Sequence, residues 1–177
     1  MSYTPPSTDT AATTIPLVPK ACYRVLVTSA NNDDSKKTGA KQNCLSVQIL
    51  SPDIVQTHAG VAQTAGIEGK MYFTFSEKNV KNVSATCKAL GFAVNASYPD
   101  EAAWIAHQQE QIMGLLNKTF EMVVSSKREP MLGPDGAPLT DSAGRPIQGR
   151  EVADFSSFNV VGLVKTLEEV GGSVTPY

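Results

Sequence analysis

The sequence predicts a mainly β fold with a helical insert, and three observations carry this prediction. Apolar and polar residues alternate, at the period of two typical of half-buried strands, in segments near both ends of the chain. Between residues 80 and 116 the apolar spacing changes to that of amphipathic helices. Long polar segments with turn-forming residues separate the strands, so we expect the strands to pair as hairpins.

The first two predicted strands cover residues 21–28 and 42–50. Residues 21–28 are rich in β-branched side chains, which favour strands. Residues 31–41 are polar throughout and contain a glycine, which predicts a long exposed loop. Residues 42–50 alternate regularly, and the side predicted to be buried carries Leu45, Val47 and Ile49.

A loop and a third strand are predicted next. Residues 51–66 show weak periodicity and contain two glycines, which predicts a loop. Residues 67–76 alternate again, so they form the third predicted strand. Its predicted inward-facing residues are Met71, Phe73 and Phe75.

Two helices form the predicted insert. Apolar residues between 80 and 90 recur at helical spacing, and Gly91 follows where the end of a helix favours a left-handed residue. A second helix is predicted from residue 99 to residue 116. Its first turn contains Asp100 and Glu101, and acidic residues there interact favourably with the helix dipole.

The chain then returns to strand patterns. Residues 118–126 alternate, and residues 150–161 supply the last predicted strand. Between them, residues 130–149 contain two turn signals, Gly-Pro-Asp-Gly and Ser-Ala-Gly-Arg-Pro. Residues 1–20 are predicted to be a flexible N-terminal arm, and residues 165–177 a short helical piece within a C-terminal tail.

This order of elements is that of a five-stranded OB-fold barrel, with the helices between the third and fourth strands. We therefore predict an OB-fold nucleic-acid-binding domain over residues 21–164. In that fold, the loops that join strands 1–2 and 4–5 frame the binding face. Here the corresponding segments, residues 30–41 and 130–149, are the two longest polar excursions.

Length, composition and cysteine usage narrow the class of protein. The chain has 177 residues, 41% of them hydrophobic, and a formal net charge of -2, which suits one folded domain with tails. It has no apolar run of 18 residues, so we expect no membrane partner. Residues 1–20 lack the features of a secretory signal. We expect a cytoplasmic protein whose Cys22, Cys44 and Cys87 are reduced, small core residues.

The sequence contains no clear pattern for catalysis, a metal or a cofactor. Residues 66–71 resemble the end of a phosphate-binding loop but lack its hydroxyl residue and the helix behind it. The two histidines, His58 and His107, lack metal-binding spacing, and Asp33 and Asp34 lack the spacing of a calcium loop. We therefore expect no catalytic residue, metal or cofactor. An enzyme whose active site leaves no such pattern is the least favoured alternative.

Cationic residues are unevenly distributed. Residues 20–50 contain five bases and two acids, a net charge of +3, whereas residues 99–118 contain one base and three acids, a net charge of −2. A barrel with a basic loop face and an acidic helical back would attract a polyanion to one side. The predicted phosphate-binding residues are Arg24, Lys36, Lys37, Lys41, Lys70, Lys127, Arg128, Arg145 and Arg150.

Aromatic residues are the second requirement for binding unpaired bases, which stack on exposed rings. Tyr72 lies on the polar face of the third predicted strand, beside Lys70. Phe155 and Phe158 cannot both point inward at a spacing of three without a bulge, and we favour Phe155 as the exposed ring. Tyr23 is a weaker candidate. The alternative for each ring is packing in the core.

Short motifs at the strand and helix boundaries carry a resemblance to a known family: Tyr23–Val27, Thr38–Lys41, Leu45–Ile49, Gly69–Phe73, Leu90-Gly91 and Lys118–Val124. Over residues 21–162 the chain resembles bacteriophage-encoded single-stranded DNA-binding proteins, which are small OB-fold proteins that coat replication or recombination intermediates. The resemblance implies that Lys41, Lys70, Tyr72 and the Lys127-Arg128 pair line the path of the DNA strand.

The predicted function is therefore binding of single-stranded DNA without sequence specificity, in the cytoplasm of an infected bacterial host. Other replication or recombination proteins and further copies of the chain are the additional partners to consider. The alternative is a phage structural or assembly protein whose barrel docks to other subunits. In that case the docking segments would be the arm, the tail and residues 130–149.

Overall fold

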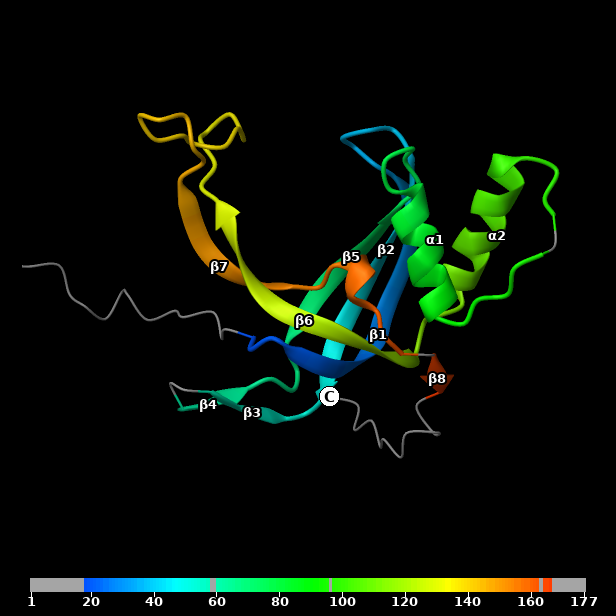
Figure 1. Ribbon diagram of the computed structural model, residues 1–177, viewed down its shortest axis with the longest axis horizontal. Coiled ribbons are helices and arrows are strands. Elements are labelled where there is room, and N and C mark those ends of the chain that lie inside the picture. The colour runs from blue at the N-terminus through cyan, green and yellow to red at the C-terminus, as the bar shows by residue number, and fades with distance from the viewer. Residues whose placement is uncertain (1–17, 58–59, 96, 163, 167–177) are drawn as a thin grey trace, which may run out of the picture.

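The computed structural model describes residues 18–57, 60–95, 97–162 and 164–166 (Figure 1). Nearly all of the predicted arm, and the tail after residue 166, lie outside the described residues. The main sheet is antiparallel and has the strand order β5-β2-β1-β6-β7, with β8 also paired to β6. Its strands are β1 (Ala21–Asp34), β2 (Lys41–Ser51), β5 (Glu68–Thr74), β6 (Lys118–Pro130), β7 (Gln148–Asp154) and β8 (Lys165–Thr166).

The inward faces of the central strands form the core, as the alternation predicted. Buried residues alternate with less buried ones along β2, along β5 from Lys70, and along β6 from Phe120 to Val124. The buried residues include Leu45, Val47, Ile49, Met71, Phe73, Phe120, Met122 and Val124. The alternation of apolar and polar residues therefore predicted these strands correctly, because each strand buries only one of its faces.

The first strand is longer than predicted. The loop expected over residues 31–41 is only a turn over residues 35–40, because β1 continues to Asp34 and pairs in register with the start of β2. The side chains of Asn32 and Asn43 form a hydrogen bond across the two strands, and Lys41 Nζ lies 2.9 Å from Asp34 Oδ1. These cross-strand pairs outweigh the low strand propensity of Asn and Asp.

The loop predicted over residues 51–66 contains a second, two-stranded sheet, so that prediction is wrong. Strand β3 (Ile54–Thr57) pairs with β4 (Gly60–Gln63). Large apolar side chains on this hairpin, including Ile54 and Val61, are exposed to solvent. Val55 of the hairpin packs against the core but is only partly buried. The hairpin is too short and too exposed to give an alternating apolar stripe, so periodicity alone did not reveal the strands.

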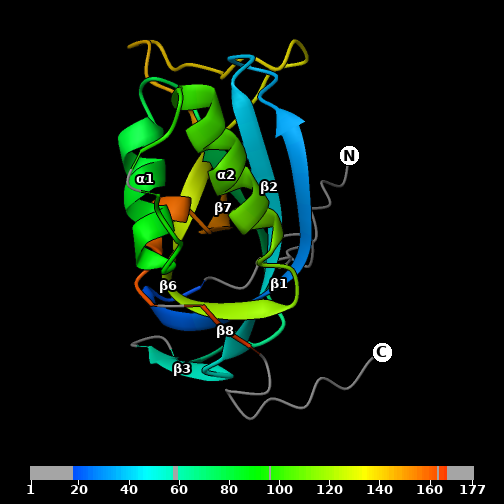
Figure 2. The same ribbon diagram turned by 90° about the vertical axis from the view of Figure 1, so that its right-hand side faces the viewer.

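The helical insert follows the prediction closely. Helix α1 (Val80–Ala89) ends beside Gly91, which has φ +75°, and helix α2 (Glu101–Met113) begins at Asp100, whose carboxylate accepts a hydrogen bond from the Ala103 amide. Both helices lie on one side of the sheet, opposite the long β6–β7 hairpin (Figure 1, Figure 2). No helix within the described ranges is long and apolar enough to cross a bilayer.

The sheet is open, so the predicted closed barrel is wrong. Strands β5 and β7 are its two edges and form no hydrogen bonds with each other. The last predicted strand, residues 150–161, also ends early, because the chain leaves β7 after Asp154 and enters a short 3-10 helix, η2 (Ser157–Asn159). The hydroxyl of Thr86 donates to the Ser157 carbonyl at 3.0 Å and ties this helix to α1.

Side-chain packing bridges the gap where hydrogen bonds would close the barrel. The ring of Phe155 lies directly over Gly69 of β5, and a Cβ placed on Gly69 would lie 2.0 Å from Phe155 Cδ2. Only a glycine leaves room for the ring here. The Phe155 ring packs against the backbone of Gly69 and thus connects the two edges of the sheet.

Both ends of the described chain pack against β6. Val18 is buried, and its amide donates to the Ser126 hydroxyl at 2.9 Å, so the folded domain begins slightly before residue 21. Lys165 and Thr166 pair with the start of β6 as β8. The short helical piece predicted from residue 165 is therefore a strand at its first two residues, and its remainder lies outside the described residues.

Candidate functional site

A groove of about 490 Å³ lies between the outer face of β5 and the β6–β7 hairpin. Its lining residues are Lys70, Tyr72, Lys127, Glu129 and residues 152–157. The groove follows the gap between the two edge strands, so residues far apart in the sequence come together across it. Four of the predicted site residues line it: Lys70, Tyr72, Lys127 and the buried Phe155.

The alternation of β5 determines which of its side chains reach the groove. Met71 and Phe73 point into the core, so Lys70 and Tyr72 point to the outer face. The Tyr72 side chain is 50% exposed. On the neighbouring strand β2, Cys44 lies opposite Tyr72. A half-exposed aromatic ring beside a lysine, on a polar sheet face, is the arrangement predicted from the sequence.

The phenol of Tyr72 is electrically neutral near neutral pH. Burial raises the pKa of Tyr72 above its usual value of 10.0, and the thiol of Cys44 across the strand raises it further. A neutral phenol offers a flat apolar ring and one hydroxyl without repelling a phosphate.

Charges along the groove are mixed. Lys127 Nζ lies 2.8 Å from Asp154 Oδ1, so this lysine is already paired with a carboxylate. Glu129 lines the same groove. Lys70 has no ion pair within the described part of the chain. Of the two groove lysines, Lys70 is therefore the one available to a phosphate without breaking an existing ion pair.

The turn between β1 and β2 supplies further free cations. Ser35 and Ala40 close the turn, with the Ser35 amide donating to the Ala40 carbonyl at 2.8 Å. Lys36 and Lys37 are exposed at its tip, and Lys41 is paired with Asp34 at its base. The turn and the β6–β7 hairpin extend toward the same end of the molecule (Figure 1, Figure 2). The predicted framing of one face by these two connections is therefore present in outline.

The β6–β7 connection, residues 131–147, is not the basic rim that the sequence suggested. Its single base, exposed Arg145, is outnumbered by Asp135 and Asp141. Asp141 Oδ1 accepts hydrogen bonds from the amides of Ala143 and Arg145, which fixes the second of the two turns. The segment instead exposes four large apolar side chains: Met131, Leu132, Leu139 and Ile147.

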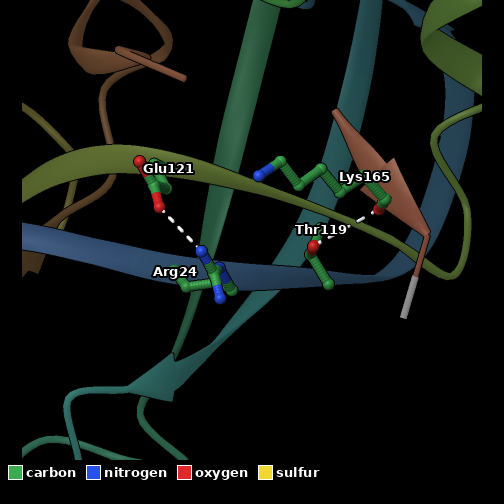
Figure 3. Close-up of polar contacts among 4 residues, drawn as sticks. All are labelled: Arg24, Thr119, Glu121 and Lys165. Atoms are coloured by element: carbon green, nitrogen blue, oxygen red, sulfur yellow. Dashed lines mark hydrogen bonds and ion pairs between the residues drawn. The ribbon is translucent and has the colours of Figure 1, made fainter. Parts of the chain in front are cut away.

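Arg24 does not line the groove, although the sequence placed it with the other predicted phosphate-binding residues. It pairs with Ser51, at the end of β2 opposite to the lysine-bearing turn. There one guanidinium nitrogen, Nη2, lies 2.8 Å from Glu121 Oε1, as Figure 3 shows. Lys165 of β8 lies beside this pair, in a separate cleft of about 220 Å³. The ion pair with Glu121 gives Arg24 a structural partner.

The remaining predicted residues divide between two faces of the sheet. Arg128 is exposed but follows Lys127 directly in β6, so it points to the opposite face. Arg150 lies on β7, and its side chain is outside the described part of the structure, as is that of Phe158. The sheet therefore does not gather all the predicted cations into one groove.

Two aromatic predictions have clear outcomes. Phe155 is only 3% exposed, so its predicted role as a stacking platform is wrong: its ring fills the space above Gly69. Tyr23 is fully buried, and its hydroxyl donates to the Pro19 carbonyl at 2.8 Å. Tyr72 is left as the exposed ring among the three.

The three cysteines differ in environment. Cys87 is buried, and burial raises the pKa of its thiol to about 12. Cys44 is half-buried beside Tyr72, and Cys22 is exposed, so the prediction that all three are core residues is wrong. Cys22 precedes the inward-facing Tyr23 in β1 and so points outward. Burial, followed by the nearby charge of Glu121, raises the pKa of the Cys22 thiol.

Sequence reasoning missed two of the acids that line the groove. The alternation around Leu45 placed Cys44 and Ser46 on the outer face of β2, where they lie opposite Tyr72 and Lys70. Asp154 and Glu129 had no such signal, because their place at the groove depends on the register of β7 against β6.

No candidate metal cluster accompanies the groove in the part of the chain that the structure describes. Within those residues, no three His, Cys, Asp or Glu side chains gather closely enough to hold a metal ion. His107 Nδ1 and the hydroxyl of Tyr98 form a hydrogen bond of 2.7 Å. The same hydroxyl accepts a hydrogen bond from the Asn95 amide at 3.0 Å. Tyr98 thus links Asn95 to His107 of helix α2.

No protein-family model matches the chain, and no curated protein matches its sequence. The residues and the geometry of the groove therefore carry the functional argument.

Proposed function

We propose that this protein binds single-stranded DNA without sequence specificity, on the outer face of a partly open OB-type sheet. The observation that carries the proposal is the half-exposed Tyr72 beside Lys70, in a groove between the two edge strands. Lys70 has no ion pair among the described residues. Single-strand binders combine such aromatic rings, on which bases stack, with cations that follow the phosphates.

The strand order supports the OB-type assignment. Strands β1, β2, β5, β6 and β7 correspond to the five strands of that fold, and both helices lie between the third and fourth of them. The fold tolerates partial opening and binds its ligand at strands 2 and 3 and at the two connections described above. In this chain, β2 and β5 supply that face, and Tyr72 and Lys70 project from it.

Each part of the site has a distinct role in the proposal. Tyr72 stacks on a base, and Lys70 pairs with the phosphate beside it. Lys36 and Lys37, exposed at the turn, attract the adjoining backbone. Lys127 contributes less, because binding a phosphate would first require it to exchange Asp154.

The resemblance to bacteriophage single-stranded DNA-binding proteins extends the proposal to a role. By that resemblance the protein coats and protects replication or recombination intermediates in an infected cell. Partners that handle the same intermediates, and further copies of the chain, would then act on the same DNA.

The test is a titration of fluorescently labelled oligo-dT, with anisotropy measured at several salt concentrations. We expect binding to weaken as salt rises, with a log–log slope of about −0.7 for each phosphate contact. A duplex of the same length should bind more weakly, because its bases cannot stack on Tyr72. Equal affinity for the two forms, or binding indifferent to salt, would overturn the proposal.

A second candidate function is supported by a different observation. The four exposed apolar side chains of residues 131–147 suit a structural or assembly protein that docks to other subunits. Light scattering with and without oligo-dT separates the two candidates. Large assemblies that form equally in both conditions, without DNA affinity, would favour the assembly role.

A further inference from the structure

The groove between β5 and the β6–β7 hairpin carries opposite charges on its two walls. On the β5 wall, Lys70 lies beside the exposed ring of Tyr72 and forms no ion pair among the described residues. The other wall carries Lys127, Glu129 and Asp154, whose charges sum to −1. Because like charges repel, a nucleic-acid strand in this groove should place its phosphates toward β5 and its bases toward the hairpin wall.

The contact between Phe155 and Gly69 brings the two walls close together. Gly69 lies on the inner face of β5, as Met71 does, and the Phe155 ring packs over it. Asp154 directly precedes Phe155, and Lys70 directly follows Gly69. Both of these charged residues line the groove, yet they form no ion pair with each other. A ligand that lies between them can therefore contact both.

Asp154 is a carboxylate held in a fixed position on the hairpin wall. Lys127 Nζ lies 2.8 Å from its Oδ1, and the Asp154 side chain is 23% exposed. An ionised carboxylate has about four acceptor positions, so Asp154 can accept another hydrogen bond while it stays paired with Lys127. Its partial burial strengthens a hydrogen bond made there.

The ligand that suits this arrangement is a nucleotide with an amino group on its base. The groove volume of about 490 Å³ lies within the range of small-molecule sites. With its phosphate at Lys70 and its ring on Tyr72, a nucleotide directs the edge of its base toward the opposite wall. Cytosine carries an amino group on that edge, which donates to carboxylates. Thymine and uracil carry a carbonyl oxygen at the same ring position, which a carboxylate repels.

We propose that Asp154 gives the groove a preference for cytosine over thymine or uracil, by accepting a hydrogen bond from the amino group of the base stacked on Tyr72. The inference rests on the proposed DNA binding, and it adds a preference at one base position to the affinity that all sequences share. Lys127 is then a positioning residue, because its ion pair orients the carboxylate. Contact with the base also offsets the repulsion between Asp154 and the phosphates.

The first test compares oligo-dC with oligo-dU of equal length, by fluorescence anisotropy at slightly alkaline pH, where cytosine is neutral. Homopolymers present the same base to the groove in every register. We expect oligo-dC to bind about 5-fold more tightly, the low end of the discrimination that one base contact gives. The salt slopes should be equal, because the slope counts phosphate contacts. Equal affinities for the two strands would overturn the proposal.

Asp154→Asn tests the residue itself. An asparagine amide can donate to the uracil carbonyl as well as accept from cytosine, so the preference for oligo-dC should fall to near equality. The ratio of the two affinities is the readout, because the change also releases Lys127 and alters the affinity for both strands. A preference that stays unchanged in Asp154→Asn would overturn the proposal.

Glu121→Gln is the matched control. Glu121 Oε1 also lies 2.8 Å from a cation, Nη2 of Arg24, but Glu121 does not line the groove. This variant therefore removes one acid and breaks one ion pair away from Tyr72, and it should keep the full preference for oligo-dC. Equal loss of preference in the two variants would mean that net charge, and not contact with the base, sets the preference.

The outcomes separate this inference from the proposed function. If oligo-dC and oligo-dU bind equally, and both bind more tightly than a duplex, Asp154 has no role in base preference and the DNA binding stands. If neither strand binds, the DNA binding itself is wrong and this inference falls with it. The comparison of the two strands uses the natural chain, so it does not depend on the folding of any variant.

Discussion

The two connections at the same end of the molecule differ in chemistry. The β1–β2 turn carries Lys36 and Lys37, exposed and without an ion pair in the described structure. The β6–β7 connection, residues 131–147, by contrast carries a net charge of −1 and four exposed apolar side chains. We call residues 131–147, which reverse direction at Gly136 and Gly144, the double hairpin. One surface suits phosphates and the other suits protein. Proximity in the fold therefore does not mean a shared ligand.

Length and turn chemistry explain the difference. The β1–β2 turn has six residues between its strands, so it can expose charged side chains but cannot form a surface of its own. The double hairpin is long enough to hydrogen-bond to itself, and its two left-handed glycines allow the chain to reverse twice. Tyr72 and Lys70 lie on the sheet beside these connections.

The largest expected effect comes from the contact between Phe155, which follows β7, and Gly69 of β5. Phe155→Ala removes the ring that bridges β7 and β5, and the free energy of unfolding should fall by about 3–5 kcal/mol. Urea denaturation measures the change. If Phe155 stacked on DNA bases, as the sequence suggested, the variant would keep its stability and lose only DNA affinity.

Gly69→Ala tests the same contact from the other strand. The added methyl group would overlap the Phe155 ring, so the free energy of unfolding should fall by about 1–3 kcal/mol. Phe155→Leu in the Gly69→Ala background should recover part of this loss, because a leucine can move away from the methyl group. Additive losses in the double variant would contradict direct contact between the two residues.

The next effect concerns the ring on the sheet face. Tyr72→Ala should weaken binding of oligo-dT by about 1–3 kcal/mol, because one base loses its stacking platform. The measurement is the anisotropy titration at fixed salt. Tyr72→Phe is the matched control, since it keeps the ring and should bind nearly as well as the natural chain. Stability should be unchanged in both, in contrast to Phe155→Ala.

A smaller effect distinguishes the two connections themselves. Replacing both Lys36 and Lys37 by Ala should reduce the salt slope of DNA binding by about 1.4, at about 0.7 for each lost phosphate contact. Replacing both Lys78 and Lys88 by Ala, beside and within α1, removes the same charge from the helical side and should leave the slope unchanged. Equal slopes in the two pairs would mean that net charge alone attracts the DNA.

The sequence predicted the parts of this fold that depend on burial of one face. Alternation placed β2, β5 and most of β6, because Leu45, Phe73 and Phe120 belong to one core. It missed β3 and β4, which are short and bury only Val55, in part, against the core. It predicted a closed barrel, because nothing local to residues 150–161 shows that the chain leaves the sheet after Asp154.

The candidate site was predictable only where a single strand determines it. Lys70 and Tyr72 share the outer face of β5, so their neighbourhood follows from the alternation. The pairing of Lys127 with Asp154 and of Arg24 with Glu121 depends on register between distant strands, and residue type alone could not reveal it. Phe155 was misassigned because Gly69, its partner, is 86 residues away in the chain.

The smallest expected effect tests the chemistry of Tyr72, which lies on the sheet face beside the two connections. Because burial and then Cys44 raise its pKa above 10.0, the phenol keeps its proton, and DNA affinity should not respond to this group below pH 10.0. Above that pH the phenolate would repel a phosphate, by about 1 kcal/mol for unit charges a few ångströms apart in water. Lysines also lose charge there, so the measurement is the difference between the natural chain and Tyr72→Phe. Affinity that falls equally in both proteins would mean that no phosphate lies near the phenol, and the DNA path would have to lie nearer the lysine turn.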